Sequence, residues 1–392
     1  MSEYSNTWGI LTGIRPAKLA TQMLEAGKKD AEILGHFMQE FHADESKAKL
    51  ALAVARNERR ITAQMYPDGV SLYIGIPFCP TRCVYCSFVT NAVASSAHLI
   101  PEYLNCLMRE ITVTAKLVKQ RGKRLETVYI GGGTPTTLSA EQLEQLICFV
   151  FSSFDMSGVK EFTVEAGRPD TITEDKLKTL KSCGVSRISI NPQSMNEQTM
   201  RVIGRRHTPD DIRHAFALAR KCGFDVINMD IIAGLPGETL TMFQHTVAEV
   251  EKLSPENTTV HTMSIKRASR LKETLEEYSM TRGEEVAQMV DFAREAMSSA
   301  GKQPYYLYRQ KNILGNLENV GYSKPGFESL YNIYIMEEIQ TILALGCGGS
   351  TKTVNKESGL IQRIFNVKEP KDYIERIDEM LERKQSLYDM ID

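Results

Sequence analysis

The sequence has no apolar run close to the about 20 residues that a membrane-spanning helix needs. Its N-terminus, MSEYSNTWGIL, has neither the basic nor the apolar stretch of a secretory signal. It also has no surplus of one charge, since 47 lysines and arginines stand against 49 aspartates and glutamates. Nothing in the composition therefore points to a membrane or to nucleic acid as a partner. We expect a cytoplasmic protein.

Cysteine is scarce, and eight residues in 392 are too few for a disulfide scaffold. Three of the eight, Cys79, Cys83 and Cys86, nevertheless lie together, which in a reducing compartment is typical of metal ligation. The other five are scattered and are interpreted as small side chains in packing roles: Cys106, Cys148, Cys183, Cys222 and Cys347.

What the sequence does contain is an alternation of strand-like and helix-like runs, in a composition that is 42% hydrophobic and 24% charged. The six strand-like runs, several of them rich in Val, Ile, Tyr and Thr, cover residues 71–78, 126–131, 161–166, 187–191, 225–233 and 258–265. Amphipathic segments separate most of them and cover residues 101–121, 140–151, 174–183, 209–222 and 240–253. Alternation of this kind predicts parallel strands joined by helical crossovers.

Six such units predict an α/β fold, a partial (β/α)6 barrel of the TIM type, with a doubly wound open sheet as the competing architecture. In both folds, binding sites gather at the carboxyl ends of the strands. The remaining segments divide the chain into three parts. These are a helical N-terminal segment (residues 1–65), the barrel (66–270), and a smaller mixed C-terminal domain (271–392) that would cap the barrel, contact substrate and begin with a helical stretch to residue 299.

The cysteine cluster reads Cys79-Pro-Thr-Arg-Cys83-Val-Tyr-Cys86 and directly follows the first predicted strand. Thiolates suit zinc and iron–sulfur clusters, and a structural zinc normally has four ligands. Only three cysteines are local, so zinc would need a distant fourth ligand such as Cys347 or a histidine. Three thiolates on a four-iron cluster instead leave one iron open to a further ligand.

This spacing, its place after the first strand, and Tyr85 before the third cysteine resemble the radical S-adenosylmethionine (SAM) superfamily. In that superfamily SAM chelates the open iron, and one electron from the cluster cleaves SAM to a radical that abstracts hydrogen from carbon. The resemblance implies a 4Fe–4S cluster on Cys79, Cys83 and Cys86, and SAM as the second cofactor. It also implies an external electron donor such as flavodoxin or ferredoxin.

The same resemblance implies a SAM pocket at the ends of the later strands. The glycine loop of residues 131–133 would bind the amino group of the SAM methionine, although alone it would indicate only a tight turn. Glu165 would bind the ribose hydroxyls, or else be a carboxylate at the rim of its strand. His207 is either an acid or base or a plain loop histidine. The implied set is Tyr73, Gly132, Gly133, Thr134, Glu165, Gln193, Arg205 and Asp230.

Longer motifs are similar to the oxygen-independent coproporphyrinogen III oxidase group: LYIGIPFCPTRCVYCSF, YIGGGTPTTL, NPQS and NMDIIAGLPGET. The segments WGILTGIRP and YYLYRQKNILGNLEN point to its coproporphyrinogen dehydrogenase HemZ-like branch, whose longer N-termini imply a shortened form here. The resemblance implies a tetrapyrrole substrate, with two propionates of coproporphyrinogen III oxidatively decarboxylated to vinyls in heme biosynthesis. By charge and place, the candidates to bind substrate carboxylates are Arg15, Lys266, Arg267, Arg309 and Lys311, although a surface position is the simpler interpretation for any one of them.

Departures from the oxidase pattern leave other functions open. Oxidases of this group carry a fourth cysteine two residues after the third, where this chain has Phe88, as the heme-trafficking branch does. The oxidase N-terminal substrate-contacting segment has no match here, and neither has the His-Asn-containing C-terminal pattern of the heme-trafficking branch. The alternatives are a heme-binding chaperone and a radical SAM methyltransferase or heme-modifying enzyme.

Overall fold

The centre of the protein is one eleven-stranded sheet. The computed structural model describes residues 7–13, 15–87, 91–266, 269, 271, 278 and 280–391. Six parallel strands follow in chain order across the sheet: β1 (Gly69–Ile76), β4 (Arg124–Gly132), β5 (Glu161–Glu165), β6 (Arg187–Ser189), β7 (Ile227–Ala233) and β8 (Asn257–Thr262). A doubly wound sheet would instead reverse its strand order at a switch point. The observed order confirms the predicted partial barrel.

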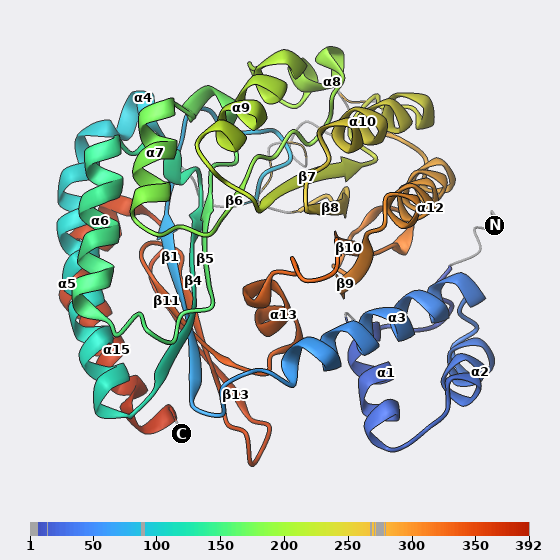
Figure 1. Cartoon of the computed structure of the whole chain (residues 1–392), viewed down its shortest axis with the longest axis horizontal. Coiled ribbons are helices and arrows are strands. Elements are labelled where there is room, and N and C mark those ends of the chain that lie inside the picture. Colours follow the sequence, from blue (N-terminus) through green and yellow to red (C-terminus); the bar gives the residue numbers. More distant parts are fainter. Residues whose placement is uncertain are drawn as a thin grey trace.

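Helices cover the outer face of these strands (Figure 1). They are α5 (Ile100–Gln120), α6 (Ala140–Ser153), α7 (Glu174–Ser182), α9 (Pro209–Lys221) and α10 (Leu240–Leu253), with the shorter α4 (Val93–Ser96) and α8 (Glu197–Val202) in the connections. In α5, Leu104, Leu107 and Ile111 recur at helical spacing and are buried, which explains why this face lies on the sheet. The predicted helical crossovers are confirmed.

The helical N-terminal segment is also confirmed and consists of α1 (Pro16–Glu25), α2 (Asp30–Glu40) and α3 (Glu45–Thr62). It attaches to the sheet through the buried carboxylate of Glu318. Lys47 of α3 and the indole of Trp8 each donate a hydrogen bond of 2.7 Å to that carboxylate. A buried charge needs such partners, so this contact holds the segment against the sheet.

The C-terminal part adds strands to both edges of the same sheet. On one edge β11 (Thr341–Leu345) pairs in parallel with β1, followed by antiparallel β12 (Ser350–Val354) and β13 (Ile361–Phe365). On the other, β10 (Asn319–Ser323) pairs antiparallel with β8 and with β9 (Gln303–Tyr308). The helices here are α12 (Gly283–Ser299), α13 (Leu330–Glu337), α14 (Pro370–Glu375) and α15 (Ile377–Gln385). The domain boundaries at residues 66 and 271 stay a prediction.

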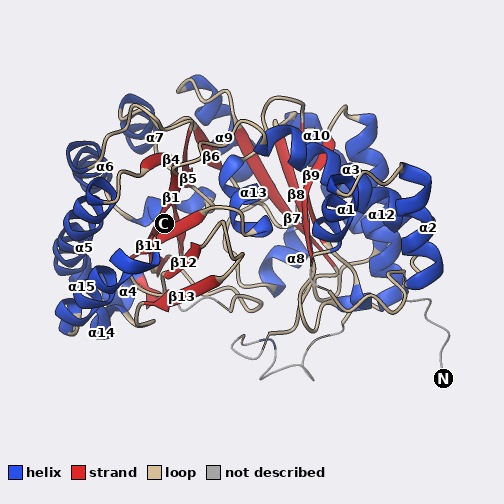
Figure 2. Ribbon diagram, turned by 90° about the horizontal axis from the view of Figure 1, so that it is seen from below, coloured by secondary structure: helices blue, strands red, loops and turns tan. Residues whose placement is uncertain are grey.

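The helix α13 lies inside the curve of the sheet, between its two halves (Figures 1 and 2). The ring of Tyr331 stacks on Tyr129 of β4, with ring centroids 4.5 Å apart, and on Tyr73 of β1 at 6.3 Å. The helix therefore forms part of the barrel interior and not of a separate unit.

Buried carboxylates fix α13 near the amino ends of the strands. The Tyr334 hydroxyl donates to Glu126 of β4 at 3.1 Å, and the Leu330 amide donates to Glu161 of β5 at 2.8 Å. Because α13 occupies this end, the carboxyl ends of the strands stay available for a site. No helix within the described residues is long and apolar enough to cross a membrane.

We expect Tyr331→Ala to lower the free energy of unfolding by about 3 kcal/mol, because it removes a buried ring and both of its stacking contacts. Denaturant unfolding measures the loss. The matched control is Tyr388→Ala, since Tyr388 is 42% exposed, and it should cost less than about 1 kcal/mol. Equal losses would contradict a core role for α13.

Candidate active site

The cysteine-bearing loop begins at the carboxyl end of β1. It contains the short strand β2 (Phe78–Cys79), which pairs with β3 (Asn91–Ala92). Cys83 is buried, whereas Cys79 and Cys86 are partly exposed. All three cysteines of the motif therefore follow the first barrel strand, where the sequence predicts them.

Backbone hydrogen bonds on either side of Val84 fix this loop. The Val84 amide donates to the carbonyl of Ile203, which follows β6, at 3.2 Å. The Val84 carbonyl accepts from the amide of Leu271, which follows β8, at 2.9 Å. The loop is thus held by segments from the other side of the barrel.

The alternative of a zinc ion completed by Cys347 has no support in the geometry. Among the described residues, no three Cys, His, Asp or Glu side chains gather closely enough to hold a single metal ion. The Cys347 thiol is buried and donates to the carbonyl of Lys368, as a packing residue can. A four-iron cluster is larger than one ion, so its thiolates need not converge on one point.

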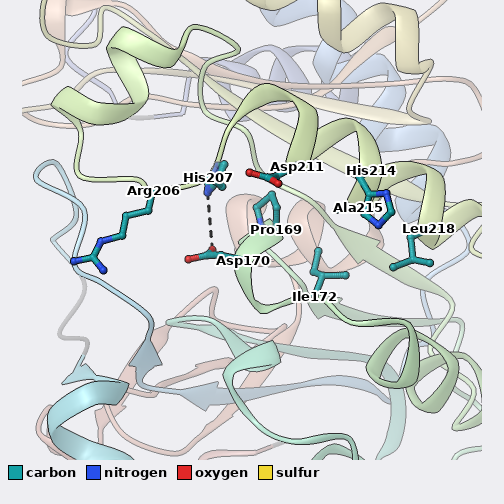
Figure 3. A pocket seen from close by; sticks show the side chains of 9 residues that line it. All are labelled: Pro169, Asp170, Ile172, Arg206, His207, Asp211, His214, Ala215 and Leu218. Atoms are coloured by element: carbon teal, nitrogen blue, oxygen red, sulfur yellow. Dashed lines mark ion pairs between the residues drawn. The ribbon is translucent and has the colours of Figure 1, made fainter.

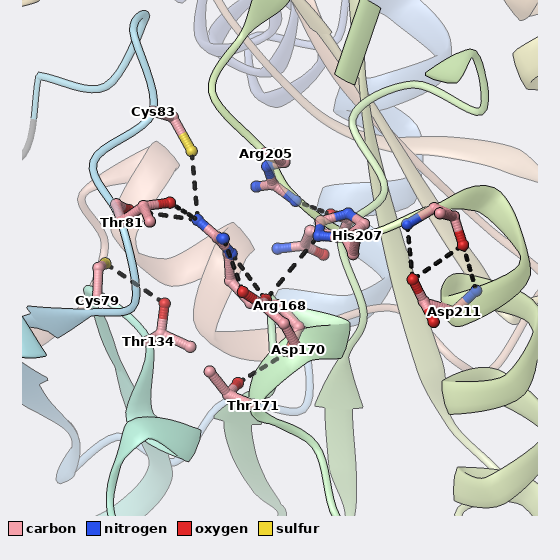
Figure 4. Close-up of polar contacts among 12 residues, drawn as sticks. Cys79, Thr81, Cys83, Thr134, Arg168, Asp170, Thr171, Arg205, His207 and Asp211 are labelled. Atoms are coloured by element: carbon pink, nitrogen blue, oxygen red, sulfur yellow. Dashed lines mark hydrogen bonds and ion pairs between the residues drawn. The ribbon is translucent and has the colours of Figure 1, made fainter. Parts of the chain in front are cut away.

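Arg168 places a cationic donor on the Cys83 thiol (Figure 4). Its Nε and Nη2 donate to the two carboxylate oxygens of Asp170 at 3.0 and 2.9 Å. Its Nη1 donates to the Thr81 carbonyl at 3.3 Å and to Cys83 Sγ at 3.8 Å. Burial raises the pKa of the Cys83 thiol, but the charges of Arg205 and Arg168 outweigh burial and lower it. Sequence reasoning missed Arg168, whose only signal is an Arg-Pro-Asp run after a strand.

The glycine loop after β4 lies directly against the cysteine loop. The Gly133 amide donates to the Ile76 carbonyl at 2.8 Å, and the Thr134 amide donates to the Phe78 carbonyl at 2.7 Å. A Cβ on Gly133 would stand 2.6 Å from the Phe78 oxygen and 2.8 Å from the Ile76 oxygen, so only glycine fits. This approach also brings the Thr134 hydroxyl to 3.4 Å from Cys79 Sγ.

Glu165 ends β5 beside the glycine loop and accepts a hydrogen bond of 2.6 Å from the Tyr129 hydroxyl. Burial raises the pKa of Glu165 to about 7, with a further increase from the charge of Asp230. The Tyr129 hydroxyl and the Gly132 amide act in the opposite direction. Gly132 has a φ of +106°, and the Tyr73 hydroxyl lies 3.2 Å from where its Cβ would stand.

Asp230 on β7 differs from Glu165, because its pKa is lowered although it is largely buried. Burial raises the pKa of Asp230, but the contact with His261, whose Nε2 lies 3.7 Å away, and the hydrogen bond from Asn228 outweigh burial. The Asn228 amide donates at 2.7 Å. The site therefore combines one ionised carboxylate with one that takes up a proton near pH 7.

Two buried polar side chains in this region have hydrogen-bonding atoms to spare. Gln193 has a φ of +66°, and its backbone amide donates to the Asp230 carbonyl at 2.9 Å. The Arg205 guanidinium donates to the Asn191 carbonyl and, at 3.2 Å, to the Tyr85 hydroxyl. Within the described residues, Oε1 of Gln193 and Nε of Arg205 are buried without a partner. Buried unsatisfied atoms are costly, so these two fit a polar ligand that is not part of the chain.

His207 borders a cavity of about 240 Å³ between the segment after β5 and α9 (Figure 3). Its Nδ1 lies 3.9 Å from Asp170, and within the described residues neither ring nitrogen has a hydrogen-bond partner. Burial, followed by the charge of Arg205, lowers the pKa of His207 to about 3. At neutral pH the ring is uncharged and does not act as an imidazolium acid.

Contacts connect the predicted site residues into one group at the carboxyl ends of the strands. Thr134 reaches the cysteine loop, Gly132 lies beside Glu165 and Tyr73, and Gln193 binds the backbone of Asp230. Arg205 lies beside Cys83. The structure thus brings the set together, while the role of each residue toward a cofactor stays a prediction.

Two of the five cationic candidates are engaged elsewhere. Arg15 pairs with Glu338. Arg309 is buried and donates to the Leu11 carbonyl at 2.6 Å. Both side chains therefore stabilise the attachment of the N-terminal segment.

Of the other three, Lys266 lies in the site region. It is partly buried, and burial lowers its pKa while nearby Cys86 acts in the opposite direction. Lys311 is exposed. Arg267 lies outside the described residues, as does Phe88.

Comparison with known proteins agrees with this arrangement. Residues 73–250 match the Radical SAM superfamily. The oxygen-independent coproporphyrinogen-III oxidase-like protein HemZ of Bacillus subtilis (strain 168) is 44% identical over 96% of this chain and 76% of its own length. The chain belongs to the radical SAM superfamily, among the oxygen-independent coproporphyrinogen-III oxidase-like proteins.

One further sequence relative and one solved structure are similar to this chain. The heme chaperone HemW of Bacillus subtilis (strain 168) is 32% identical over 73% of this chain and 73% of its own length. The solved structure of coproporphyrinogen III oxidase (HemN) from Escherichia coli superposes with a TM-score of 0.63 at 22% identity, over 83% of this chain and 73% of that one. The structural likeness bears on the fold, and the chaperone shows that this family includes more than one activity.

We expect Gly133→Ala to lower the free energy of unfolding by about 1–3 kcal/mol, because the new methyl group would meet backbone oxygens that have no room to move. Denaturant unfolding of the protein without cofactors measures the loss. Gly13→Ala is the control, since a Cβ there would meet nothing within 4 Å. A loss in Gly133→Ala no larger than in the control would contradict the close approach of the two loops.

The raised pKa of Glu165 predicts how the free energy of unfolding changes with pH. Because burial raises its folded pKa from 4.5 to about 7, it contributes stability that is full below about pH 4.5 and is lost as the pH rises through about 7. Glu165→Gln should therefore weaken the decline of stability over this range, measured by denaturant unfolding of the protein without cofactors. Burial raises the pKa of Glu238 to about 7 as well, so Glu238→Gln is the companion variant and should remove a similar part. An unchanged decline in Glu165→Gln would contradict a raised pKa.

Proposed function

We propose that this chain is a radical SAM oxidoreductase of the coproporphyrinogen dehydrogenase type, which converts two propionates of coproporphyrinogen III to vinyls. The observation that carries the proposal is the joint placement of three thiols, a glycine loop and buried polar groups at one end of the barrel. Similarity to the HemZ protein over nearly the whole chain supports the substrate class.

In this proposal Cys79, Cys83 and Cys86 hold a 4Fe–4S cluster. Three soft thiolates are the expected donor set. The Thr134 hydroxyl beside Cys79 and the Arg168 guanidinium beside Cys83 are polar partners of the kind that tunes such clusters. With SAM bound, the cluster would supply the single electron that makes possible the abstraction of a hydrogen atom from an unactivated carbon.

The SAM pocket in this proposal is formed by the loops after β4 to β7. Gly132 and Gly133 let the backbone approach the methionine part, where Thr134 and Tyr73 also lie. Glu165 would accept hydrogen bonds from the ribose hydroxyls. The remaining contacts would come from Gln193, Arg205 and Asp230, and the unpartnered atoms of the first two support them.

The chain's own groups also shape the space for substrate. The rings of Tyr73, Tyr129 and Tyr331 stack on one another in the barrel interior, and the Tyr129 hydroxyl donates to Glu165. An aromatic wall suits the apolar face of a tetrapyrrole. Of the five candidate cations, Lys266 is partly buried near Cys86, and in this proposal it would meet a substrate carboxylate.

A heme chaperone is the second candidate function. It is supported by similarity to the HemW protein and by Phe88, which stands where the oxidases have a fourth cysteine. In a chaperone the cluster and SAM would serve transfer or regulation, and heme would be bound without decarboxylation.

Anaerobic incubation of the reconstituted protein with SAM, a reductant and coproporphyrinogen III separates the two functions. We expect 5′-deoxyadenosine, carbon dioxide and a vinyl product. Formation of deoxyadenosine without a vinyl product would contradict the dehydrogenase proposal but would still support radical SAM chemistry. Stoichiometric heme binding without carbon dioxide release would favour the chaperone.

The cluster assignment is tested by Cys83→Ala. This variant should lose the bound iron and sulfide and form deoxyadenosine only at background, because two thiolates do not hold the cluster. Cys148→Ala is the matched control, since Cys148 is exposed and distant in sequence, and it should keep both properties. A normal four-iron cluster in Cys83→Ala would refute the ligand set.

A further inference from the structure

A groove of about 600 Å³ opens beside the cysteine loop, between that loop and the segment formed by α8 and the start of α9. We call it the arginine groove, and its lining includes Thr81, Glu197, Arg201, Arg205, Arg206 and His207. The mechanism proposed above assigns a role to Arg205 alone among these residues. The groove is therefore a feature that the reaction itself does not explain.

The charge of the arginine groove is positive, since three arginines face one glutamate and the His207 ring is neutral at pH 7. Arg201 pairs with Glu197 at 3.1 Å, but both side chains are exposed, at 80% and 57%. An exposed pair of this kind is worth little, so Arg201 can turn to another partner.

Arg206 is the second exposed cation of the groove. It is exposed and, within the described part of the chain, forms no ion pair. It extends away from the other side chains of the adjoining His207 cavity (Figure 3). A groove with two such arginines suits a partner with an acidic surface.

Two residues that line the arginine groove, Thr81 and Arg205, lie near Cys83 (Figure 4). Thr81 lines the groove, and its carbonyl and hydroxyl accept from the Arg168 nitrogen that also donates to Cys83 Sγ. Arg205, which also lines the groove, lies beside the same thiol.

Hydrogen bonds join the groove to the cysteine loop. The Thr81 hydroxyl donates to the Gly204 carbonyl at 3.3 Å, and the Val84 amide donates to the Ile203 carbonyl. Both acceptors belong to the turn after α8. These bonds therefore connect the two walls of the groove beside the cysteines.

We propose that the arginine groove is the docking surface for an acidic one-electron carrier protein, which reduces the cluster on Cys79, Cys83 and Cys86. The inference rests on the proposed function, because it requires the cluster to be there. The carrier is oxidised by loss of one electron, and the cluster is reduced by gain of that electron. No bond forms or breaks and no proton is needed.

The test is the rate at which a reduced carrier bleaches the visible absorbance of the reconstituted, cluster-loaded protein in stopped flow. The probe is reduced flavodoxin at low ionic strength, and the variant is Arg201→Glu with Arg206→Glu. We expect reduction roughly 10-fold slower than in the wild type, because charge reversal removes electrostatic steering. Added salt should slow the wild type and have less effect on the variant.

Two controls keep the result specific. Reduced methyl viologen, a small cation that needs no docking surface, should reduce the wild type and the variant at similar rates. Arg376→Glu reverses a comparable exposed arginine that pairs along a C-terminal helix, and it should leave the flavodoxin rate unchanged. Restoring the charge with Arg201→Lys and Arg206→Lys should recover most of the rate.

Unchanged reduction by flavodoxin in the double variant would overturn the proposal. Equal slowing by flavodoxin and methyl viologen would also overturn it, because the arginines would then act on the cluster and not on the carrier. SAM cleavage, measured separately with methyl viologen, tests the proposed function. A protein that accepts the electron from flavodoxin but cleaves no SAM would refute that function and leave the docking surface standing.

Discussion

The site depends on one close approach of two backbones. The amides of Gly133 and Thr134 donate to the carbonyls of Ile76 and Phe78, so the loop after β4 lies against the loop after β1. No Cβ fits at Gly133 between those oxygens. Because these bonds set the distance between the loops, they also bring Thr134 to Cys79. Parallel strands in sequential order make the approach possible, since their carboxyl ends meet at one edge.

The opposite end of the barrel explains why this edge is available. The helix α13 occupies the interior near the amino ends, where Glu126 and Glu161 accept hydrogen bonds from Tyr334 and Leu330. Buried carboxylates without partners would be costly, and α13 supplies those partners. Closing one end with a helix therefore satisfies the charges that the strands bury there and leaves the other end to bind ligands.

Sequence reasoning recovered what is local and missed what is not. The strands, the crossover helices and the loops that follow them are readable because hydrophobic period and glycine position are properties of short windows. The pairing of β11 with β1 joins residues some 270 apart by number, and no window contains it. Arg168 was missed for a related reason, because an arginine next to an aspartate in a loop is typical of a solvated pair. Only the fold shows that Asp170 holds one side of the guanidinium while the other side faces Cys83.

The cysteine loop has positive charge on its groove side and carboxylates on its barrel side, and the partners of each buried group explain this difference. On the groove side, Arg168 and Arg205 are buried, and a buried guanidinium is stable only when its donors are used. Asp170 takes two donors of Arg168. The Asn191 carbonyl and the Tyr85 hydroxyl take the Nη1 and Nη2 donors of Arg205 and leave its Nε without a partner in the described residues. Positive charge is thereby fixed beside Cys83, so the buried thiol has a lowered pKa where burial alone would raise it.

On the barrel side the buried groups are acidic. Asp230 is ionised and Glu165 is close to half-protonated at pH 7. The difference lies in the partners. Asp230 accepts a hydrogen bond from Asn228 and has His261 at 3.7 Å, whereas Glu165 accepts from the Tyr129 hydroxyl alone among side chains of the described residues. The arginines on the groove side attract anions, and the carboxylates on the barrel side attract cations. The buried Cys83 thiolate is stabilised by the groove side, so the arginines favour the ionised thiol that the proposed cluster requires.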